Sequence, residues 1–430
     1  MTSAAKTEVD TLVVGGGPAG MWAALSAAEC GMRVAVADDN PEMGGQVWRA
    51  ELAKTAPEVA GLIQKLREAG VQLLAGTQVV DQVAPGVLLA EGDRGASYLG
   101  FGKLILATGA REQFLPFPGW TLPRVIGAGG LQALVKSGLP VRGKRLALAG
   151  TGPLLLAVAA YLRAHGAEIA MICEQASRSA LASFGAALLR QPEKLLQALS
   201  LRKALTGIPL ALNCWVVAAH GTVAVEGIDI WHEGKVKRIA CEYLACGFHL
   251  VPNTELATLL GCRLVNGYVE VDEFQRTSRP GIFCAGEPTG IGGLELSVVE
   301  GKVAGLAAAG REKAARKFFR RRRMLGAFAR AMDRTFALRP ELKNLVEAET
   351  IVCRCEDVSY AQLEREVSWR MAKLMTRCGM GPCQGRICGP VTKFLLGWSP
   401  DSVRPPLFPV TVGTLAHSFS GCNVDDNQER

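Results

Sequence analysis

Four cysteines near the C-terminal end form two spaced pairs, Cys353-x-Cys355 and Cys383-x4-Cys388. Thiolates of this kind bind iron–sulfur clusters or zinc. Zinc sites more often use Cys-x2-Cys pairs, so the spacing favours a [2Fe–2S] cluster, with zinc or no metal as alternatives. Four thiolates suffice for such a cluster, and we therefore expect the nearby Cys378 to be spare.

A glycine-rich turn near the start, Gly15-Gly-Gly17-Pro18-Ala19-Gly20, could bind a different group. Gly15 permits a tight turn, Gly17 lets the backbone approach a pyrophosphate, and Gly20 allows close packing of a helix on a strand. The residue types in this order predict a dinucleotide site.

The surroundings of the turn support this prediction. The β-branched run 9–14 predicts a buried parallel strand, and the Ala-rich segment 21–30 predicts a helix whose N-terminus faces the phosphates. A second strand is expected over 33–37, ending at Asp38, where an acid accepts ribose hydroxyls.

Later segments favour FAD over NAD as the dinucleotide. Gly45 and Gln46 follow the second strand, Ala107-Thr108-Gly109 ends an apolar run, and a further strand ends in Gly286-Glu287. This last ending resembles the second FAD motif of two-dinucleotide-fold flavoproteins, although Glu287 stands where Asp is usual. The expected cofactor-binding residues are Gly15, Gly17, Pro18, Ala19, Asp38, Gly45, Gln46, Val79, Ala107, Thr108, Gly109, Gly286 and Glu287. No side chain is expected to be catalytic.

A second glycine turn, Gly150-Thr-Gly152-Pro-Leu-Leu155, follows the expected strand 145–149 and begins the expected helix 154–164. In related enzymes such a turn binds NAD(P)H. Leu155 occupies the third glycine position and should crowd the helix or the nucleotide. We therefore expect a Rossmann-like domain with a structural role, with working NAD(P) binding as the alternative.

Composition and charge narrow the class of protein. The chain has 430 residues, 49% hydrophobic, which predicts two or three domains. Residues 1–10 lack the apolar core of a signal peptide, and no apolar run is long enough to predict a transmembrane segment. Reduced cysteines in the cytoplasm are therefore expected.

The positive charge is concentrated in segment 313–323, where Lys and Arg residues are interleaved with Phe318 and Phe319. This pattern predicts an amphipathic linker helix, a docking surface for a partner subunit or flavin phosphate, or a site for anionic lipid. Nucleic acid is not expected, because no recognised binding module accompanies the basic residues.

The cysteine segments Cys-Arg-Cys-Glu-Asp and Thr-Arg-Cys-Gly-Met-Gly-Pro-Cys-Gln-Gly-Arg-Ile-Cys resemble the bacterioferritin-associated-ferredoxin-like [2Fe–2S] domain. Fused behind two dinucleotide folds, they make the chain similar to the α subunits of heteromeric flavin dehydrogenases over roughly Val9 to Pro409. That family includes opine oxidase, D-hydroxyproline dehydrogenase, hydrogen cyanide synthase and relatives of heterotetrameric sarcosine oxidase.

The resemblance implies a division of labour between chains. A separate β subunit of the amino-acid-oxidase type would bind the amine and its own FAD, and an FMN often lies between the two chains. Further partners are a downstream electron acceptor and a small ferredoxin-like subunit. The implied function is electron transfer for oxidation of an amino acid or secondary amine, such as D-hydroxyproline or an opine. A complex of this kind could associate peripherally with a membrane.

Other functions remain open. One is a stand-alone NAD(P)H-dependent reductase of a ferredoxin-like carrier, which Leu155 disfavours. Another is the flavoprotein subunit of hydrogen cyanide synthase, which would serve glycine oxidation. A third is an assembly or iron-handling protein with a vestigial flavin site, which the full set of flavin motifs disfavours.

The expected fold class is α/β. An FAD-binding domain over 1–112 and 251–310 would contain a second Rossmann-like domain inserted at 113–250. A basic helical linker over 311–345 would lead to a small helical [2Fe–2S] domain over 346–410 and a polar tail over 411–430. Within the small domain, segment 358–373 predicts a helix capped by Ser359.

Overall fold

The computed structural model describes residues 5–48, 57–189, 191–400 and 402–420. The chain divides into two compact units. The first comprises residues 1–111, 252–329 and 402–430, and the second comprises residues 112–251 and 330–401. The α/β class agrees with the sequence analysis.

The first unit is built on a mixed sheet with the strand order β3-β2-β1-β6-β5-β4, and β19 also pairs with β6. Strands β1, β2, β3, β6 and β19 pair in parallel, whereas β4 and β5 pair antiparallel. The strand bounds are β1 Ala5–Val14, β2 Val34–Ala37, β3 Gln72–Leu74, β4 Gln78–Ala84, β5 Val87–Gly92, β6 Gly95–Leu106 and β19 Ile282–Cys284. Both predicted strands around the first glycine turn are confirmed.

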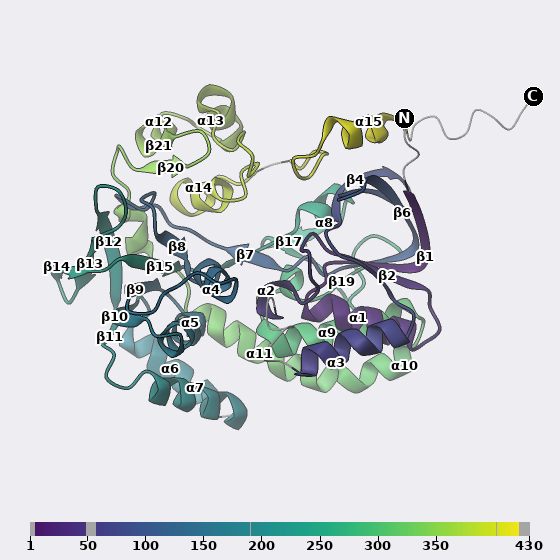
Figure 1. Cartoon of the computed structure of the whole chain (residues 1–430), viewed down its shortest axis with the longest axis horizontal. Coiled ribbons are helices and arrows are strands. Elements are labelled where there is room, and N and C mark those ends of the chain that lie inside the picture. The colour runs from purple at the N-terminus through teal and green to yellow at the C-terminus, as the bar shows by residue number, and fades with distance from the viewer. Residues whose placement is uncertain (1–4, 49–56, 190, 401, 421–430) are drawn as a thin grey trace, which may run out of the picture. The chain divides into compact units, whose positions relative to one another are not determined.

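Three helices cover one face of this sheet: α1 (Pro18–Ala28), α3 (Pro57–Glu68) and α9 (Gly293–Ala308), as Figure 1 shows. Helix α1 replaces the predicted helix 21–30 and begins three residues earlier. The opposite face packs against α8 (Glu255–Leu259) and Leu407. Smaller elements of this unit are α2 Gly45–Trp48, β17 Leu264–Val265, β18 Tyr268–Val269, η1 Glu287–Thr289, α10 Glu312–Ala315 and η2 Arg316–Phe318.

Helices α1 and α9 approach each other very closely. A Cβ added at Gly301 would lie 2.2 Å from the carbonyl oxygen of Ala19, and one at Gly305 would lie 2.1 Å from that of Ala23. Only glycine fits at such backbone contacts. The spacing of these two glycines, one helical turn apart, therefore fixes α9 against the first turns of α1.

The second unit contains a fully parallel sheet with the order β11-β10-β9-β15-β8. Helices α4 and α5 pack on one face, and an antiparallel sheet of β12, β13 and β14 packs on the other. The strand bounds are β8 Val125–Gly127, β9 Arg145–Gly150, β10 Glu168–Glu174, β11 Leu210–Leu212, β12 Cys214–His220, β13 Gly227–His232, β14 Lys235–Ala240 and β15 Tyr243–Gly247. The helices are α4 Ala128–Lys136, α5 Pro153–Ala164, α6 Arg178–Leu188 and α7 Pro192–Ala204.

Strands β7 (Ala110–Glu112) and β16 (Leu250–Pro252) lie where the chain passes from one unit to the other. The expected linker forms α11 (Phe319–Thr335) and the 3-10 helix η3 (Pro340–Leu345). The basic segment is thus helical, as predicted.

The C-terminal module has its own small core around Val352, Leu363, Trp369 and Val391. Its elements are β20 Ile351–Cys353, β21 Val358–Ser359, α12 Tyr360–Glu364, α13 Trp369–Thr376 and α14 Cys388–Leu396. Ser359 caps α12 through a capping box with Gln362, as predicted. The prediction of one continuous helix was wrong, because Ser368 caps a second helix by accepting the Met371 N–H.

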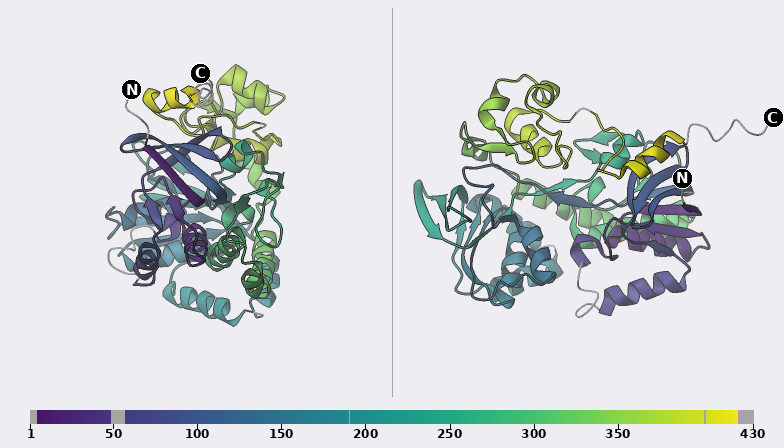
Figure 2. Two further views of the ribbon diagram at one scale, coloured as in Figure 1. Left: turned by 90° about the vertical axis from the view of Figure 1, so that its right-hand side faces the viewer. Right: turned by 45° about the horizontal axis from the view of Figure 1, so that its top comes forward.

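The chain returns to the first unit after residue 401. The Leu407 N–H donates to the Val80 carbonyl at 2.8 Å. Thr411 and Thr414 both donate hydroxyl bonds to Glu91. Helix α15 (Val412–Ser420), yellow in Figure 2, contacts β4, β5 and β6. The part of the polar tail that the structure describes is therefore a packed helix. Residues 421–430 lie outside the described ranges.

Candidate cofactor sites

The glycines of the first turn have different structural roles. A Cβ on Gly15 would lie 2.1 Å from the Ala107 carbonyl oxygen, and one on Gly20 would lie 1.8 Å from that of Gly15. A Cβ on Gly17 would meet only the Gly45 Cα, at 3.9 Å. Protein packing therefore requires Gly15 and Gly20, whereas the bare backbone at Gly17 is free to accept a ligand.

Gly17 is also the N-cap of α1, and no side chain caps this helix. Pro18 and Ala19 begin the helix and are buried. The first N–H groups of a helix have no partner within it and carry partial positive charge. This helix end can therefore hold a phosphate group, as the sequence predicts.

Asp38 lies at the end of β2 and is only 6% exposed. Its carboxylate accepts the Gly16 N–H and also the backbone and side-chain N–H groups of Asn40, at 2.8 and 2.7 Å. Gly45 lies close to Gly17, because a Cβ there would be 2.9 Å from the Gly17 Cα. The structure thus brings these predicted residues together around the turn.

Two more predicted positions lie near the same sheet. Gln46 is exposed on α2, next to Gly45. Val79 is buried in β4, where it pairs with Ala90.

The predicted segment Ala107-Thr108-Gly109 follows β6 and is held by Asn253. The Thr108 hydroxyl donates to the Asn253 carbonyl at 2.5 Å, and the Asn253 amide donates back to the Thr108 carbonyl at 2.9 Å. The Asn253 N–H donates to the Gly109 carbonyl at 3.0 Å. Asn253 was missing from the predicted set, since only pairing in space shows its role.

The second flavin motif lies against the first. A Cβ on Gly286 would come 2.9 Å from the Ala19 Cβ, so the backbone of this turn touches the start of α1. The half-buried Glu287 accepts the Gly293 N–H at 3.0 Å. The longer carboxylate at this position thus fixes the start of α9.

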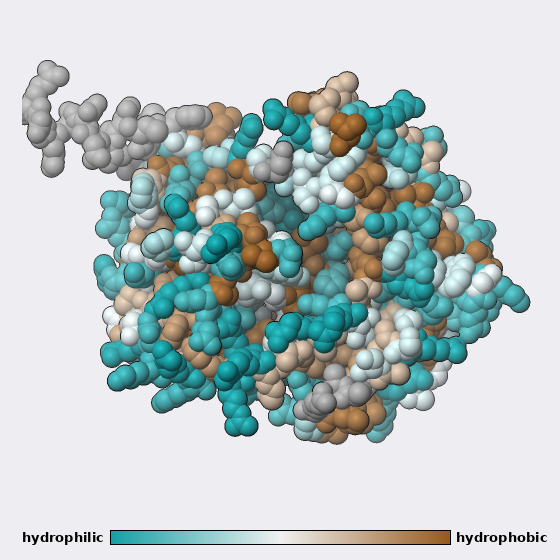
Figure 3. All heavy atoms as spheres, turned by 180° about the vertical axis from the view of Figure 1, so that it is seen from behind, coloured by the Kyte–Doolittle hydropathy of each residue, from teal (hydrophilic) through white to brown (hydrophobic). Residues whose placement is uncertain are grey.

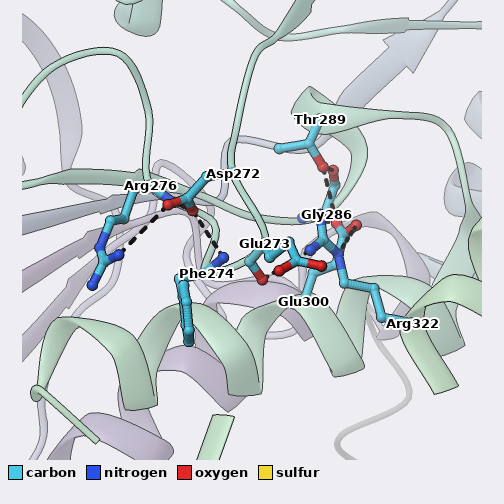
Figure 4. A network of polar contacts seen from close by, with 8 residues as sticks. All are labelled: Asp272, Glu273, Phe274, Arg276, Gly286, Thr289, Glu300 and Arg322. Carbon is cyan, nitrogen blue, oxygen red and sulfur yellow. Dashed lines mark hydrogen bonds and ion pairs between the residues drawn. The ribbon is translucent and has the colours of Figure 1, made fainter. Parts of the chain in front are cut away.

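A buried polar network supports this second motif (Figure 4). Glu300 on α9 accepts the Gly286 N–H at 3.0 Å and the Thr289 hydroxyl at 2.9 Å. Arg322 of α11 lies 3.5 Å from the same carboxylate and donates to the Glu273 carbonyl at 2.9 Å. Burial raises the pKa of Glu300, which Arg322 partly offsets. One arginine of the basic segment is therefore a structural partner of the flavin motif.

The second glycine turn is packed differently. Leu155 is 1% exposed and fills space beside Gly247, where an added Cβ would lie 3.0 Å from Leu155 Cδ2. It therefore packs in the core beneath α5 and does not displace that helix. Glu174, at the end of β10, accepts the Gly152 N–H at 2.7 Å and the Thr151 hydroxyl at 2.8 Å.

Three cysteine sulfurs converge in the C-terminal module, and two more cysteines interact with each other nearby. The sulfur atoms of Cys353, Cys378 and Cys388 all lie within 4.8 Å of one another. Cys355 is mostly exposed, and the Cys383 thiol is its hydrogen-bonding neighbour. The pKa of Cys355 is raised by the partial burial of its thiol and by its interaction with Cys383. The structure therefore places Cys378, which we had expected to be spare, among the sulfurs of two predicted ligands.

Hydrogen bonding stabilises a thiolate in this group. Bonds from Cys378 and Cys388 lower the pKa of Cys353 to about 2, and the backbone N–H groups of Gly379 and Glu356 add to this effect. The same interaction with Cys353 raises the pKa of Cys378 to about 12. Soft thiolates gathered in this way, with backbone donors beside them, suit a soft metal centre.

Trp369 forms the floor of the cysteine loop. A Cβ on Gly379 would lie 2.6 Å from its ring, and one on Gly385 would lie 3.0 Å from it. Both glycines also have positive φ, at 80° and 81°. Their absent side chains let the loop close over the ring and bring the cysteines together.

These sites and folds define the class of protein. Residues 9–309 match the family model described as pyridine nucleotide-disulphide oxidoreductase, and the chain belongs to that family. It is an oxidoreductase and a flavoprotein, which agrees with the site around Gly17.

Similarity to individual proteins indicates which group of flavoproteins this chain resembles. The chain is 31% identical to the HcnB subunit of hydrogen cyanide synthase from Pseudomonas protegens, over 96% of this chain and 95% of that protein. It is 30% identical to the A subunit of opine oxidase from Rhizobium meliloti, over 95% of this chain and 87% of that protein. The chain belongs to the family of these flavoprotein subunits, as its sequence motifs predicted.

Solved structures share the fold. L-proline dehydrogenase from P. horikoshii matches with a TM-score of 0.69 at 18% identity, covering 96% of this chain and 81% of that one. Thioredoxin reductase from T. acidophilum matches with a TM-score of 0.55 at 21% identity, covering 70% of this chain and 98% of that one.

Proposed function

We propose that this chain is the electron-transfer subunit of a heteromeric dehydrogenase that oxidises an amino acid or a secondary amine. FAD would bind at the first glycine turn, and a [2Fe–2S] cluster would bind in the C-terminal module. The clustering of the Cys353, Cys378 and Cys388 sulfurs, with Cys355 and Cys383 interacting nearby, in a chain of a flavoprotein family is the observation that supports this proposal.

The residues of the flavin site have separable roles. The N-terminus of α1 binds the pyrophosphate, Asp38 orients the ribose, and the Gly286–Glu287 turn holds the ribityl chain. FAD, when bound, supplies two-electron redox chemistry, and a cluster supplies one-electron steps. The protein would hold both groups, and we expect none of its side chains to act as the catalytic base.

The ligand set of the cluster is part of the proposal. We propose Cys353, Cys355, Cys383 and Cys388 as ligands on the sequence spacing, and the position of Cys378 makes it the competing fourth ligand. Serine variants at each of the five positions test this in anaerobically purified protein. Four should lose the visible absorption and the paramagnetic signal of the reduced state. The variant that keeps both identifies the spare cysteine.

Zinc is the alternative that this experiment must exclude. Iron and sulfide analysis of the same samples should give two of each per chain for a [2Fe–2S] cluster. Stoichiometric zinc without iron would remove the one-electron role from the module.

The amine would be oxidised on a partner subunit. The C-terminal module carries an exposed apolar patch on and beside α13: Val367 is 81% exposed, Leu374 is 65% exposed and Met375 is 67% exposed. Figure 3 shows hydrophilic and apolar areas intermixed on one face of the molecule. Apolar side chains gathered on a polar surface mark interaction sites.

The division of labour is tested by co-expression with a candidate β subunit of the amino-acid-oxidase type from the same organism. The complex should reduce an artificial acceptor with one substrate from a panel of opines, D-hydroxyproline, proline and glycine, and the isolated chain should not. Turnover of any of these by the isolated chain would disprove the division. The same proposal includes an FMN between the subunits and a small ferredoxin-like subunit. The FMN is tested by measuring the flavin content of the complex.

None of the helices in the described ranges is long and apolar enough to cross a membrane. We propose a cytoplasmic complex, which the fractionation of tagged protein in its host would test.

A further inference from the structure

The second dinucleotide site has a defined location in the second unit. In parallel α/β sheets, a nucleotide binds outside the carboxyl ends of the strands. Here these ends lead into Thr151 and Gly152 after β9, Gln175 after β10 and Asn213 after β11. All of these loops contact one segment of the same chain, Phe336–Arg339, which we call the linker strap.

Backbone carbonyls of the linker strap bind the first two loops. The Thr151 hydroxyl oxygen, whose proton is donated to Glu174, lies 3.4 Å from the Phe336 carbonyl oxygen. The Gln175 amide donates to the Ala337 carbonyl at 3.1 Å and to the Thr151 hydroxyl at 2.9 Å, and it lies 3.5 Å from the Phe336 carbonyl oxygen. Gln175 also accepts the Arg339 N–H at 3.2 Å. Gln175 is fully buried, so these bonds lie within the protein interior.

The Phe336 side chain lies over the glycine turn. A Cβ added to Gly152 would lie 3.8 Å from Phe336 Cγ, and the Phe336 ring packs edge-on against Phe184 with centroids 5.3 Å apart. Phe336 is only 7% exposed. Gly152 is the position where a pyrophosphate would approach the backbone, so the ring stands in the path of the nucleotide.

The other end of the linker strap is fixed by Arg339. Its guanidinium donates to the Asn213 side chain and lies over the Trp215 ring, 5.2 Å from the centroid. It also pairs with Glu341 at 2.6 Å. The strap is therefore anchored by hydrogen bonds, an aromatic contact and charge.

The acid of the second turn is bonded much as Asp38 is in the first. Glu174 accepts the Gly152 and Ala176 N–H groups and the Thr151 hydroxyl, so these bonds alone do not close the site. Leu155 lies in the core and is not the obstacle that the sequence indicated. The residues of the strap, and not Leu155 at the third glycine position, fill the site.

We propose that the linker strap occupies the second dinucleotide site and excludes NAD(H) and NADP(H) from it. The domain then serves as an anchor for the chain that leads into the C-terminal module. Electrons consequently enter this protein from a bound partner and not from a nicotinamide nucleotide. The proposal does not depend on which amine the complex oxidises.

The test compares the full-length chain with the double variant Phe336→Ala/Arg339→Ala. NADH and NADPH binding is measured by calorimetry, and the mobility of the strap is measured by hydrogen exchange of peptides covering 336–339. The wild-type chain should show slow exchange and no saturable binding at millimolar nucleotide. The variant should exchange faster and bind at least one nucleotide roughly tenfold or more tightly, equivalent to about 1.4 kcal/mol.

Arg330→Ala serves as the matched control, because Arg330 is exposed on α11 and outside the strap. It should behave as the wild type does. Saturable binding of NADH by the wild-type chain with the strap still protected would overturn the proposal. Faster exchange in the double variant without any gain in binding would also overturn it. If the double variant loses its flavin or its melting transition, Arg339→Ala alone is judged by the same two criteria.

Discussion

Substitutions at two glycines of the first turn should have different effects, because Gly17 is expected to serve ligand binding and Gly15 serves packing. Gly17→Ala places its new Cβ in open space toward the expected pyrophosphate, so we expect loss of bound FAD with little change in the stability of the flavin-free protein. Gly15→Ala places a Cβ 2.1 Å from a carbonyl at a φ of 108° and should cost about 1–3 kcal/mol in folding free energy.

Flavin absorbance after gel filtration measures the loss of FAD expected for Gly17→Ala. Urea unfolding of the flavin-free forms measures the loss of stability expected for Gly15→Ala. Gly61→Ala is a suitable control, since Gly61 is exposed in α3 with no atom near its missing Cβ. It should raise stability by about 0.5–1 kcal/mol without changing flavin content. Full flavin content in the Gly17 variant would refute the site.

Glu300 should make stability depend on pH. Its folded pKa is raised by burial above the ordinary value of 4.5, so the folded state binds its proton more tightly than the unfolded chain. Its contribution is therefore greatest below about pH 4.5 and is lost as pH rises through the folded pKa. Glu300→Gln should flatten this decline in unfolding free energy.

Unfolding by urea at several pH values measures the effect. Glu295→Gln on the same helix should keep the wild-type pH dependence, because Glu295 lies nearer to solvent beside Arg321. An unchanged decline in the Glu300 variant would mean that another group titrates.

At the scale of elements, the expected flavin site depends on the close contact between α1 and α9. Gly301→Ala and Gly305→Ala each place a Cβ within about 2.2 Å of a backbone oxygen of α1. Each should cost about 1–3 kcal/mol and weaken FAD binding, because α9 also bears Glu300. Thermal unfolding and FAD titration check both effects, and Gly185→Ala on α6, whose missing Cβ meets no atom, is the control.

The sequence predicted most elements that hold this site. Strands β1 and β2, helix α1 and the cap at Ser359 follow from apolar periodicity, glycine spacing and capping chemistry, which act between near neighbours. Asn253 and Glu300 were not predicted, because each acts through a contact between segments far apart in the chain. The positions of Cys378 beside Cys353 and Cys388 and of Leu155 beside Gly247 were not predicted for the same reason: loop closure and the space beside Gly247 are properties of the fold.

At the scale of the whole molecule, the chain end completes the first unit. Leu407 is 2% exposed in the core beneath β4 and β6. Leu407→Ala should lower the unfolding free energy of this unit by about 2–5 kcal/mol, whereas Val412→Ala, at an 84% exposed position, should change it little. Flavin release on heating reports on this unit, and equal melting of both variants would contradict the packing of the tail.

Trp369, packed against Gly379 and Gly385, also gives the cysteine loop an optical reporter. Indole emission is quenched by a nearby chromophore that absorbs at the same wavelengths, as iron–sulfur clusters do. The difference in fluorescence between the wild type and Trp369→Phe isolates this ring from the other six tryptophans. Assembly and loss of the centre can then be followed in real time, in dilute samples and without a paramagnetic signal.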